Sequence, residues 1–135
     1  MPANTSPIFP LVVQTSAATI VNADGTAEKT LVTAGANGTR IDAVSITSTD
    51  TAAVILTVLA HDGATSYAVG EIAVPAGSGT NGSAPAIKGL SAAHLPWIDA
   101  SGSLFLKAGW SLRVAAKAAV SSGKAVALVA FSGDY

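Results

Sequence analysis

Arg40-Ile41-Asp42-Ala43-Val44-Ser45-Ile46-Thr47 is the stretch of sequence that decides the fold. In an extended strand, Val44 and Ile46 fall on one face, while Ser45 and Thr47 fall on the other. This two-residue alternation predicts a β-strand with one face in an apolar core and one face outside it. Gly38 before the run and Asp50 after it are residues typical of turns, so the strand is expected to lie between two turns.

Similar alternating runs occur along the chain, and turn residues such as Asp-Gly and Asn-Gly separate them. The Ala-rich run 115–119 favours a helix by propensity, but the turn signals and β-branched residues around it fit a hairpin better. The spacing predicts an all-β fold, a single antiparallel β-sandwich of about eight strands that resembles a jelly roll. The expected strands cover residues 18–21, 29–33, 40–47, 53–60, 67–74, 104–106, 111–120 and 126–131.

The first sixteen residues differ from the rest, because prolines at positions 2, 7 and 10 oppose a helix and a central strand. We therefore expect an extended N-terminal arm over residues 1–16 and one β-sandwich domain over residues 17–135. The arm carries the large apolar side chains of Ile8, Phe9 and Leu11. These side chains either lie on the chain's own sandwich or reach a neighbouring subunit, since exposed apolar patches usually mark contacts.

The composition argues against several classes of function. The formal charge is −1, and the seven Lys and Arg residues are scattered, so no basic face is expected for nucleic acid. The apolar N-terminal stretch lacks the positive charges of a signal peptide, and no apolar run approaches the ~20 residues of a membrane span. A soluble protein that is made in a cytoplasm is the expectation. The chain has no Cys, which excludes a disulfide scaffold.

The sequence offers little for catalysis. A Ser-His-Asp triad would need His61 or His94 with one of Asp42, Asp62 and Asp99, but no G-x-S-x-G elbow or characteristic order supports one. His61 and Asp62 precede a glycine, so they are interpreted as turn residues. We expect no enzyme activity, no catalytic residue and no cofactor.

Metal and phosphate sites are also weakly indicated. The aspartates are separated by whole strands and form no calcium-binding loop, so a cation site would require several loops to converge. The Gly/Ser-rich segment 75–86 lacks the Lys-Ser/Thr ending of a phosphate-binding loop. A loop of this length inside a domain is usually functional or mobile.

Four apolar residues are candidates for contacts outside the core. Ile55 and Leu59 fall on the opposite face of strand 53–60 from its core residues, which predicts cover on both sides or a subunit contact. Trp97 and Trp110 either fill the core or contact a ligand or partner. Sugar-binding modules stack rings on such side chains, but only 5% of the chain is aromatic.

Four stretches of sequence, residues 38–43, 48–52, 74–82 and 129–135, resemble small virion proteins of tailed bacteriophages, and the resemblance covers roughly residues 30–135. It implies a capsid decoration protein, also called a cement or auxiliary head protein, that commonly forms trimers at threefold positions of the shell. The implied partners are the major capsid protein and further copies of the chain, without nucleic acid or membrane. The implied location is the capsid surface of the virion, after synthesis in the host bacterial cytoplasm.

On this interpretation the protein binds the outside of a capsid and stabilises it. A tail, fibre or head-completion component remains open, and so does a carbohydrate-binding β-sandwich module. The expected shell contact is Ile8, Phe9 and Leu11, with the 75–86 loop as a second candidate. The expected contacts between subunits come from Ile55, Leu59, Trp97 and Trp110.

Overall fold

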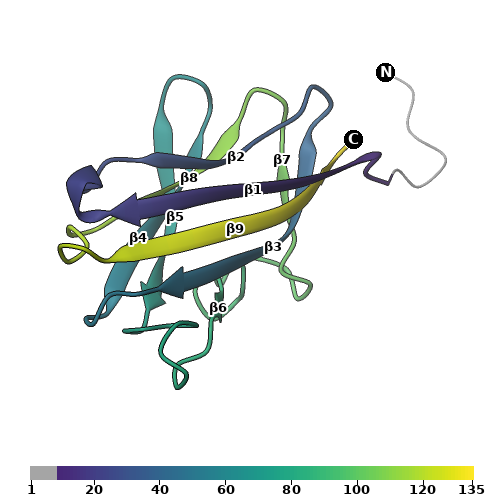
Figure 1. Ribbon diagram of the computed structural model, residues 1–135. Helices are drawn as coiled ribbons and strands as arrows, with labels where there is room; N and C mark the ends of the chain where they lie inside the picture. Colours follow the sequence, from purple (N-terminus) through teal and green to yellow (C-terminus); the bar gives the residue numbers. More distant parts are fainter. Residues whose placement is uncertain (1–8) are drawn as a thin grey trace, which may run out of the picture.

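The computed structural model describes residues 9–135, which form two antiparallel β-sheets (Figure 1). Nine strands and one 3-10 turn are found in this part of the chain, where about eight strands were expected. No helix among these residues is long and apolar enough to cross a membrane. The elements are β1 (Val12–Val21), η1 (Asn22–Asp24), β2 (Lys29–Thr33), β3 (Thr39–Ser48), β4 (Val54–His61), β5 (Ser66–Val74), β6 (Ile87–Lys88), β7 (Leu104–Leu106), β8 (Ser111–Ala116) and β9 (Ala125–Asp134).

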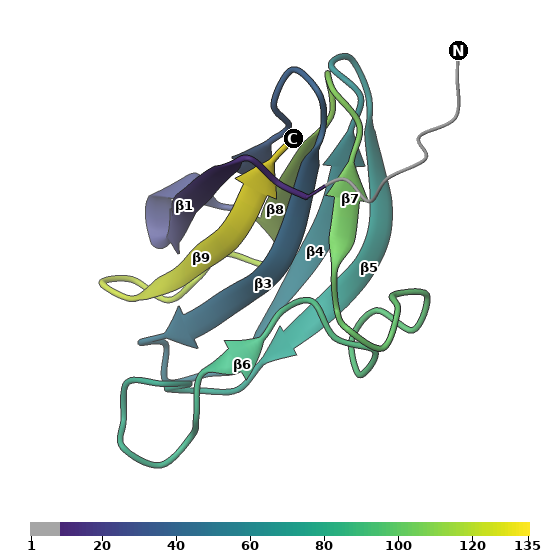
Figure 2. The same ribbon diagram turned by 90° about the vertical axis from the view of Figure 1, so that its right-hand side faces the viewer.

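In both sheets, strands from the start of the chain pair with strands from its end. The first sheet has the order β1-β9-β3-β6, and β7 pairs with the other end of β3. The second sheet has the order β2-β8-β4-β5. The chain therefore pairs its first strand with its last, its second with the one before the last, and β4 with β5. Figure 2 shows the two sheets as layers that face one another, in a β-sandwich-like arrangement.

The core lies between the two sheets, and β3 contributes to it as predicted. Val44 and Ile46 are buried, while Ser45 and Thr47 on the other face are only half-buried. Burial of apolar side chains from both layers is the main favourable term that holds the sheets together. The largest fully buried side chains are Ile20, Ile41, Ile46, Leu56, Leu90, Leu95, Leu112, Leu128, Val58, Val74, Val114 and Val120.

The first strand is longer than predicted. It begins at Val12 and not at residue 18, and it pairs with β9 without a break. The boundary expected after residue 16 therefore falls inside β1, and the last five residues of the expected arm belong to the first sheet. The reason is long-range pairing: β9 supplies a regular partner over ten residues, although residues 12–15 are exposed and show no core-facing alternation.

Two further strands differ from the prediction. β8 ends at Ala116, and the Ala-rich residues that follow form an exposed bend without a helix. Ala115 was expected on the solvent side of this strand, but it is only 8% exposed because β8 is a central strand between β2 and β4. The two-residue strand β6 was not expected, since Ile87 and Lys88 are too few to show a periodic pattern.

The Gly/Ser-rich loop 75–86 is fixed at its base. The backbone nitrogen of Ser48 donates a 2.9 Å hydrogen bond to the Ser78 carbonyl, and that of Gly77 donates one of 2.9 Å to the Asp50 carbonyl. The Thr80 hydroxyl donates one of 2.6 Å to the Ser48 carbonyl, and Ser78 is fully buried. These bonds hold the base of the loop against the end of β3, so only its outer residues remain exposed.

Candidate interaction surfaces

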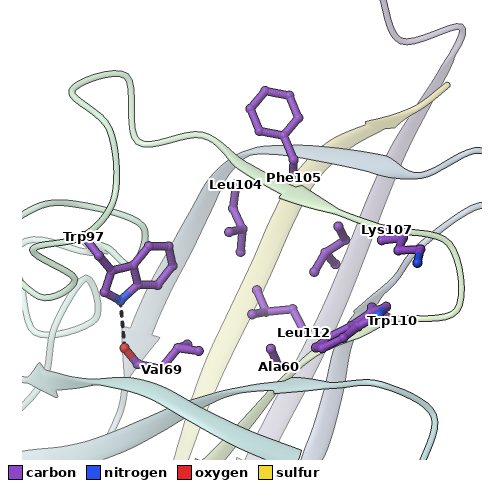
Figure 3. A pocket seen from close by; sticks show the side chains of 9 residues that line it. Ala60, Val69, Trp97, Leu104, Phe105, Lys107, Trp110 and Leu112 are labelled. Atoms are coloured by element: carbon purple, nitrogen blue, oxygen red, sulfur yellow. Dashed lines mark hydrogen bonds between the residues drawn. The ribbon is translucent and has the colours of Figure 1, made fainter.

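An apolar pocket of about 580 Å³ opens beside β7, between the edges of the two sheets (Figure 3). β7 has only three residues, so it closes little of the space between the sheets on this side of the molecule. Leu104 is directed toward the interior, whereas Phe105 points away from it (Figure 3). The lining residues are Ala60, Val69, Trp97, Leu104, Phe105, Leu106, Lys107, Trp110 and Leu112.

The two tryptophans of this pocket are held in place by contacts with β5. The indole nitrogen of Trp97 donates a 2.7 Å hydrogen bond to the Val69 carbonyl, while 49% of the residue stays exposed. Trp110 stacks on Tyr67 with ring centroids 6.2 Å apart. The pocket is therefore formed before any partner binds.

The chemistry of the pocket favours an apolar guest. Lys107 has the only polar side chain among the lining residues besides the Trp97 and Trp110 indoles, and the Trp97 N–H is already used by Val69. A sugar ring needs several hydrogen-bonding groups around it as well as an aromatic face. The lining suits an aliphatic or aromatic side chain of a partner better than it suits a sugar.

The predicted contact residues do not form one surface. Trp97 and Trp110 meet in the pocket, but Ile55 and Leu59 lie on the outer face of β4. Ile55 is 43% exposed, and Leu59 is half-buried. These two residues therefore belong to a surface separate from that of the tryptophans.

The predicted shell-contact residues are exposed where the structure describes them. Phe9 is 69% exposed and Leu11 is 83% exposed, at the end where the chain enters β1. Ile8 lies outside the described residues. Phe9 and Leu11 are therefore available to a partner.

The outer face of the first sheet is an apolar surface that sequence reasoning missed. The register places Val13, Gly133, Arg40 and Phe105 in one row across β1, β9, β3 and β7. Val13 is 89% exposed and Phe105 is 61% exposed, and Phe131 in the next row is 47% exposed. The odd-numbered apolar positions of residues 125–131 carried a signal for this face, but the pairing of β7 with β3 could not be predicted from them.

Both outer faces carry ion pairs. In the row of the first sheet that contains Val13 and Phe105, Arg40 Nε lies 2.8 Å from Asp42 Oδ1, so these two charges offset each other. The outer face of the second sheet carries ion pairs in which Lys117 lies 2.7 Å from Glu71 and Arg113 lies 3.9 Å from Glu28. The first face also exposes the large apolar side chains of Val13, Phe105 and Phe131, which are typical of a contact surface.

Asp62 and Asp99, two of the three aspartates considered for catalysis, hold turns, while Asp42 lies in β3 and pairs with Arg40. Asp62 accepts hydrogen bonds from the backbone nitrogens of Thr65 (2.7 Å) and Ala64 (2.9 Å), which lower its pKa. His61 Nδ1 accepts one of 3.0 Å from the backbone nitrogen of Gly63, so the expected turn is confirmed. Hydrogen bonds from Ser101 and from backbone N–H groups likewise lower the pKa of Asp99.

Residues 9–135 contain no group of three or more His, Asp or Glu side chains that could hold a metal ion. None of the aspartates lines the apolar pocket. No protein-family model matches the chain, and no curated protein matches its sequence.

Proposed function

We propose that this protein is a structural virion protein that binds the outside of a bacteriophage capsid and stabilises the shell. The proposal rests first on the phrases at residues 38–43, 48–52, 74–82 and 129–135, which resemble small phage virion proteins. The observation that carries it is the run of exposed apolar side chains that begins at Phe9 and Leu11 and continues onto Val13 and the outer face of the first sheet. A surface of this kind on a small domain usually marks a protein contact.

The strand order supports a jelly-roll form of the sandwich. β6 and β7 pair with the two ends of β3, so we treat them as one interrupted strand. The nine strands then occupy eight positions, which pair first with eighth, second with seventh, third with sixth and fourth with fifth. Eight positions in two packed sheets are the arrangement of jelly rolls, which occur in viral capsid domains.

The protein would act as a homotrimer. Once one subunit of a trimer docks on the shell, the other two bind at high effective concentration, so that modest contacts give durable attachment. Two surfaces are available for contacts between subunits: Ile55 with Leu59 on β4, and the pocket that contains Trp97 and Trp110. The surface around Phe9 and Leu11 would then remain free for the major capsid protein.

The test compares binding of wild type and the double variant Phe9→Ser/Leu11→Ser to undecorated capsids in a pelleting assay. We expect the double variant to lose at least tenfold in affinity. Val21→Ser is the matched control, because Val21 is an exposed apolar residue at the far end of β1 from Phe9 and Leu11. Equal binding of wild type and double variant would contradict the proposed contact.

Two alternatives are distinguished by other readouts. A tail, fibre or head-completion component would bind particles at a few sites only. A carbohydrate-binding module would show sugar affinity that depends on Trp97, whose ring is half-exposed. We favour the decoration role because the pocket around Trp97 offers few hydrogen-bonding groups to a sugar.

A further inference from the structure

The free edge of β1 lacks the features that normally protect the edge of a sheet. Among residues 9–135, β1 pairs only with β9, and the register runs over all ten residues without a bulge. Its sequence, Val-Val-Gln-Thr-Ser-Ala-Ala-Thr-Ile-Val, contains no charged residue, proline or glycine. A long, regular and uncharged edge strand is a template for pairing with another strand.

Every other sheet edge in the described part of the chain is protected. β2 has five residues, begins with Lys29 and has a register shift between Thr30 and Val32. β6 and β7 have two and three residues. β5 carries Glu71, pairs through a register shift and is covered by the Trp97 side chain at the Val69 carbonyl. Among the edge strands of the described residues, β1 alone has no short length, charge, register shift or covering side chain to protect it.

The first half of β1 also exposes apolar side chains on both faces. Val12 is 52% exposed on the face turned toward the second sheet, and Val13 is 89% exposed on the outer face. Residues 14 and 15 are exposed as well. A second strand beside β1 would bring apolar neighbours to both valines and satisfy the free backbone groups of the edge.

We infer that β1 pairs in antiparallel fashion with β1 of a second copy of this chain, about a twofold axis at Ser16. A second copy is the favoured occupant because β1 matches its own reverse: an antiparallel copy sets the valines at the start of the strand opposite the β-branched residues at its end, without any charge in the contact. The position of the axis follows from the length of the paired strand. β1 runs from Val12 to Val21, and Ser16 lies in its middle.

This register sets β-branched side chains opposite one another on both faces of the first sheet. Val12 would lie opposite Ile20 of the second copy, and Ile20 is fully buried on the core-facing side. Val13 would lie opposite Thr19 of the second copy on the outer face. Pairs of β-branched side chains across neighbouring strands stabilise a sheet, so both ends of the contact gain from this alignment.

The inference stands independently of the proposed function. If both hold, β1 pairing would connect neighbouring decoration trimers at the twofold positions between them. The shell would then carry a network of linked trimers, which explains how a small protein could stabilise a large lattice.

The first experiment measures the mass of the purified full-length protein by sedimentation over a range of concentrations. We expect the wild type at high concentration to have at least twice the mass of Thr15→Glu, in which two carboxylates would lie near the axis. Ser45→Glu is the matched control on β3, where Lys88 lies opposite the new charge, and its mass should equal that of wild type. Equal masses for wild type and Thr15→Glu would overturn the inference.

A second measurement keeps the test decisive if Thr15→Glu folds poorly. The chain has no cysteine, so single-cysteine variants react at one position only. Directly opposed residues have Cβ atoms about 4.5–5.5 Å apart, and a short bifunctional maleimide should therefore crosslink Ser16→Cys at least tenfold faster than Thr30→Cys on the edge of β2. Equal crosslinking rates would overturn the β1 contact. If Ser16→Cys crosslinks as expected but the wild-type protein does not bind capsids, the proposed function is rejected and the β1 contact stands.

Discussion

The carboxylate of Asp50 accepts hydrogen bonds from both the backbone nitrogen and the hydroxyl of Ser121, each at 2.9 Å and across 71 residues of sequence. A third bond of 3.0 Å comes from the backbone nitrogen of Ala52. Asp50 is only 2% exposed, and it joins the turn after β3 to the segment between β8 and β9. This carboxylate connects loops from both sheets.

The Asp50 contact predicts a pH dependence of stability. Backbone hydrogen bonds, first from Ser121 and then from Ala52, lower the pKa of Asp50 below its ordinary value of 3.8. A lowered folded-state pKa means that the stabilisation is complete above the unfolded-state pKa and is lost as the pH falls through the folded-state pKa. Asp50→Asn should therefore be less stable than wild type at pH 7, and the difference should shrink below about pH 4.

Urea unfolding at pH 7 and pH 3 measures this difference. Asp42→Asn is the control, because Asp42 is exposed and contacts only Arg40 on the surface. A gap between wild type and Asp50→Asn that is equally large at both pH values would show that the carboxylate charge is not responsible.

Gly102 is predicted to be a position that accepts only glycine. It has a φ of +73°, and a Cβ atom there would lie 2.7 Å from the Leu90 carbonyl oxygen. A left-handed backbone costs a non-glycine residue about 1–2 kcal/mol, and the contact with Leu90 adds to this cost. Gly82→Ala is the matched control, since Gly82 has a φ of +77° and no atom within 4 Å of the added Cβ. Chemical denaturation should show a larger loss for Gly102→Ala, and equal losses would exclude the steric contact.

Adjacent residues of β9 should respond very differently to truncation. Leu128 is fully buried, so Leu128→Ala should lower the free energy of unfolding by about 2–5 kcal/mol. Val129 is half-buried on the outer face, and Val129→Ala should cost about 1 kcal/mol or less. Thermal or urea unfolding checks the pair. A larger loss at Val129 than at Leu128 would mean that β9 presents the opposite face to the core.

The Trp97 indole should fix the loop between β6 and β7 on the edge of β5. Trp97→Phe keeps an aromatic ring but removes the hydrogen bond to the Val69 carbonyl, which should cost about 0.5–1.5 kcal/mol. Hydrogen exchange should become faster in residues 89–103, with Trp110→Phe as the control, because no hydrogen bond of the Trp110 indole holds that loop. Unchanged exchange in Trp97→Phe would show that the bond does not hold the loop.

The fold could be predicted from sequence wherever alternation was local. The predicted bounds of strands 29–33 and 104–106 match β2 and β7, because apolar residues and nearby turn residues mark both. Alternation could not predict the first half of β1, because residues 12–15 are all exposed. They form a strand because they pair with β9, more than one hundred residues further along the chain.

The candidate surfaces were less predictable for the same reason. Sequence analysis singled out Trp97 and Trp110 as contact candidates, but their place in one pocket depends on contacts with β5, the hydrogen bond of Trp97 to Val69 and the stacking of Trp110 on Tyr67. The row that joins Val13 to Phe105 crosses four strands, so it depends on the register of the whole sheet.

The proposed function is tested most directly by the number of copies bound per particle. Purified protein is mixed with undecorated capsids of the phage that encodes it, the particles are pelleted, and the bound protein is quantified at saturation. A lattice-binding decoration protein should saturate at hundreds of copies per shell and raise the temperature at which the shells break down. Saturation at a handful of copies, or no binding, would contradict the decoration role.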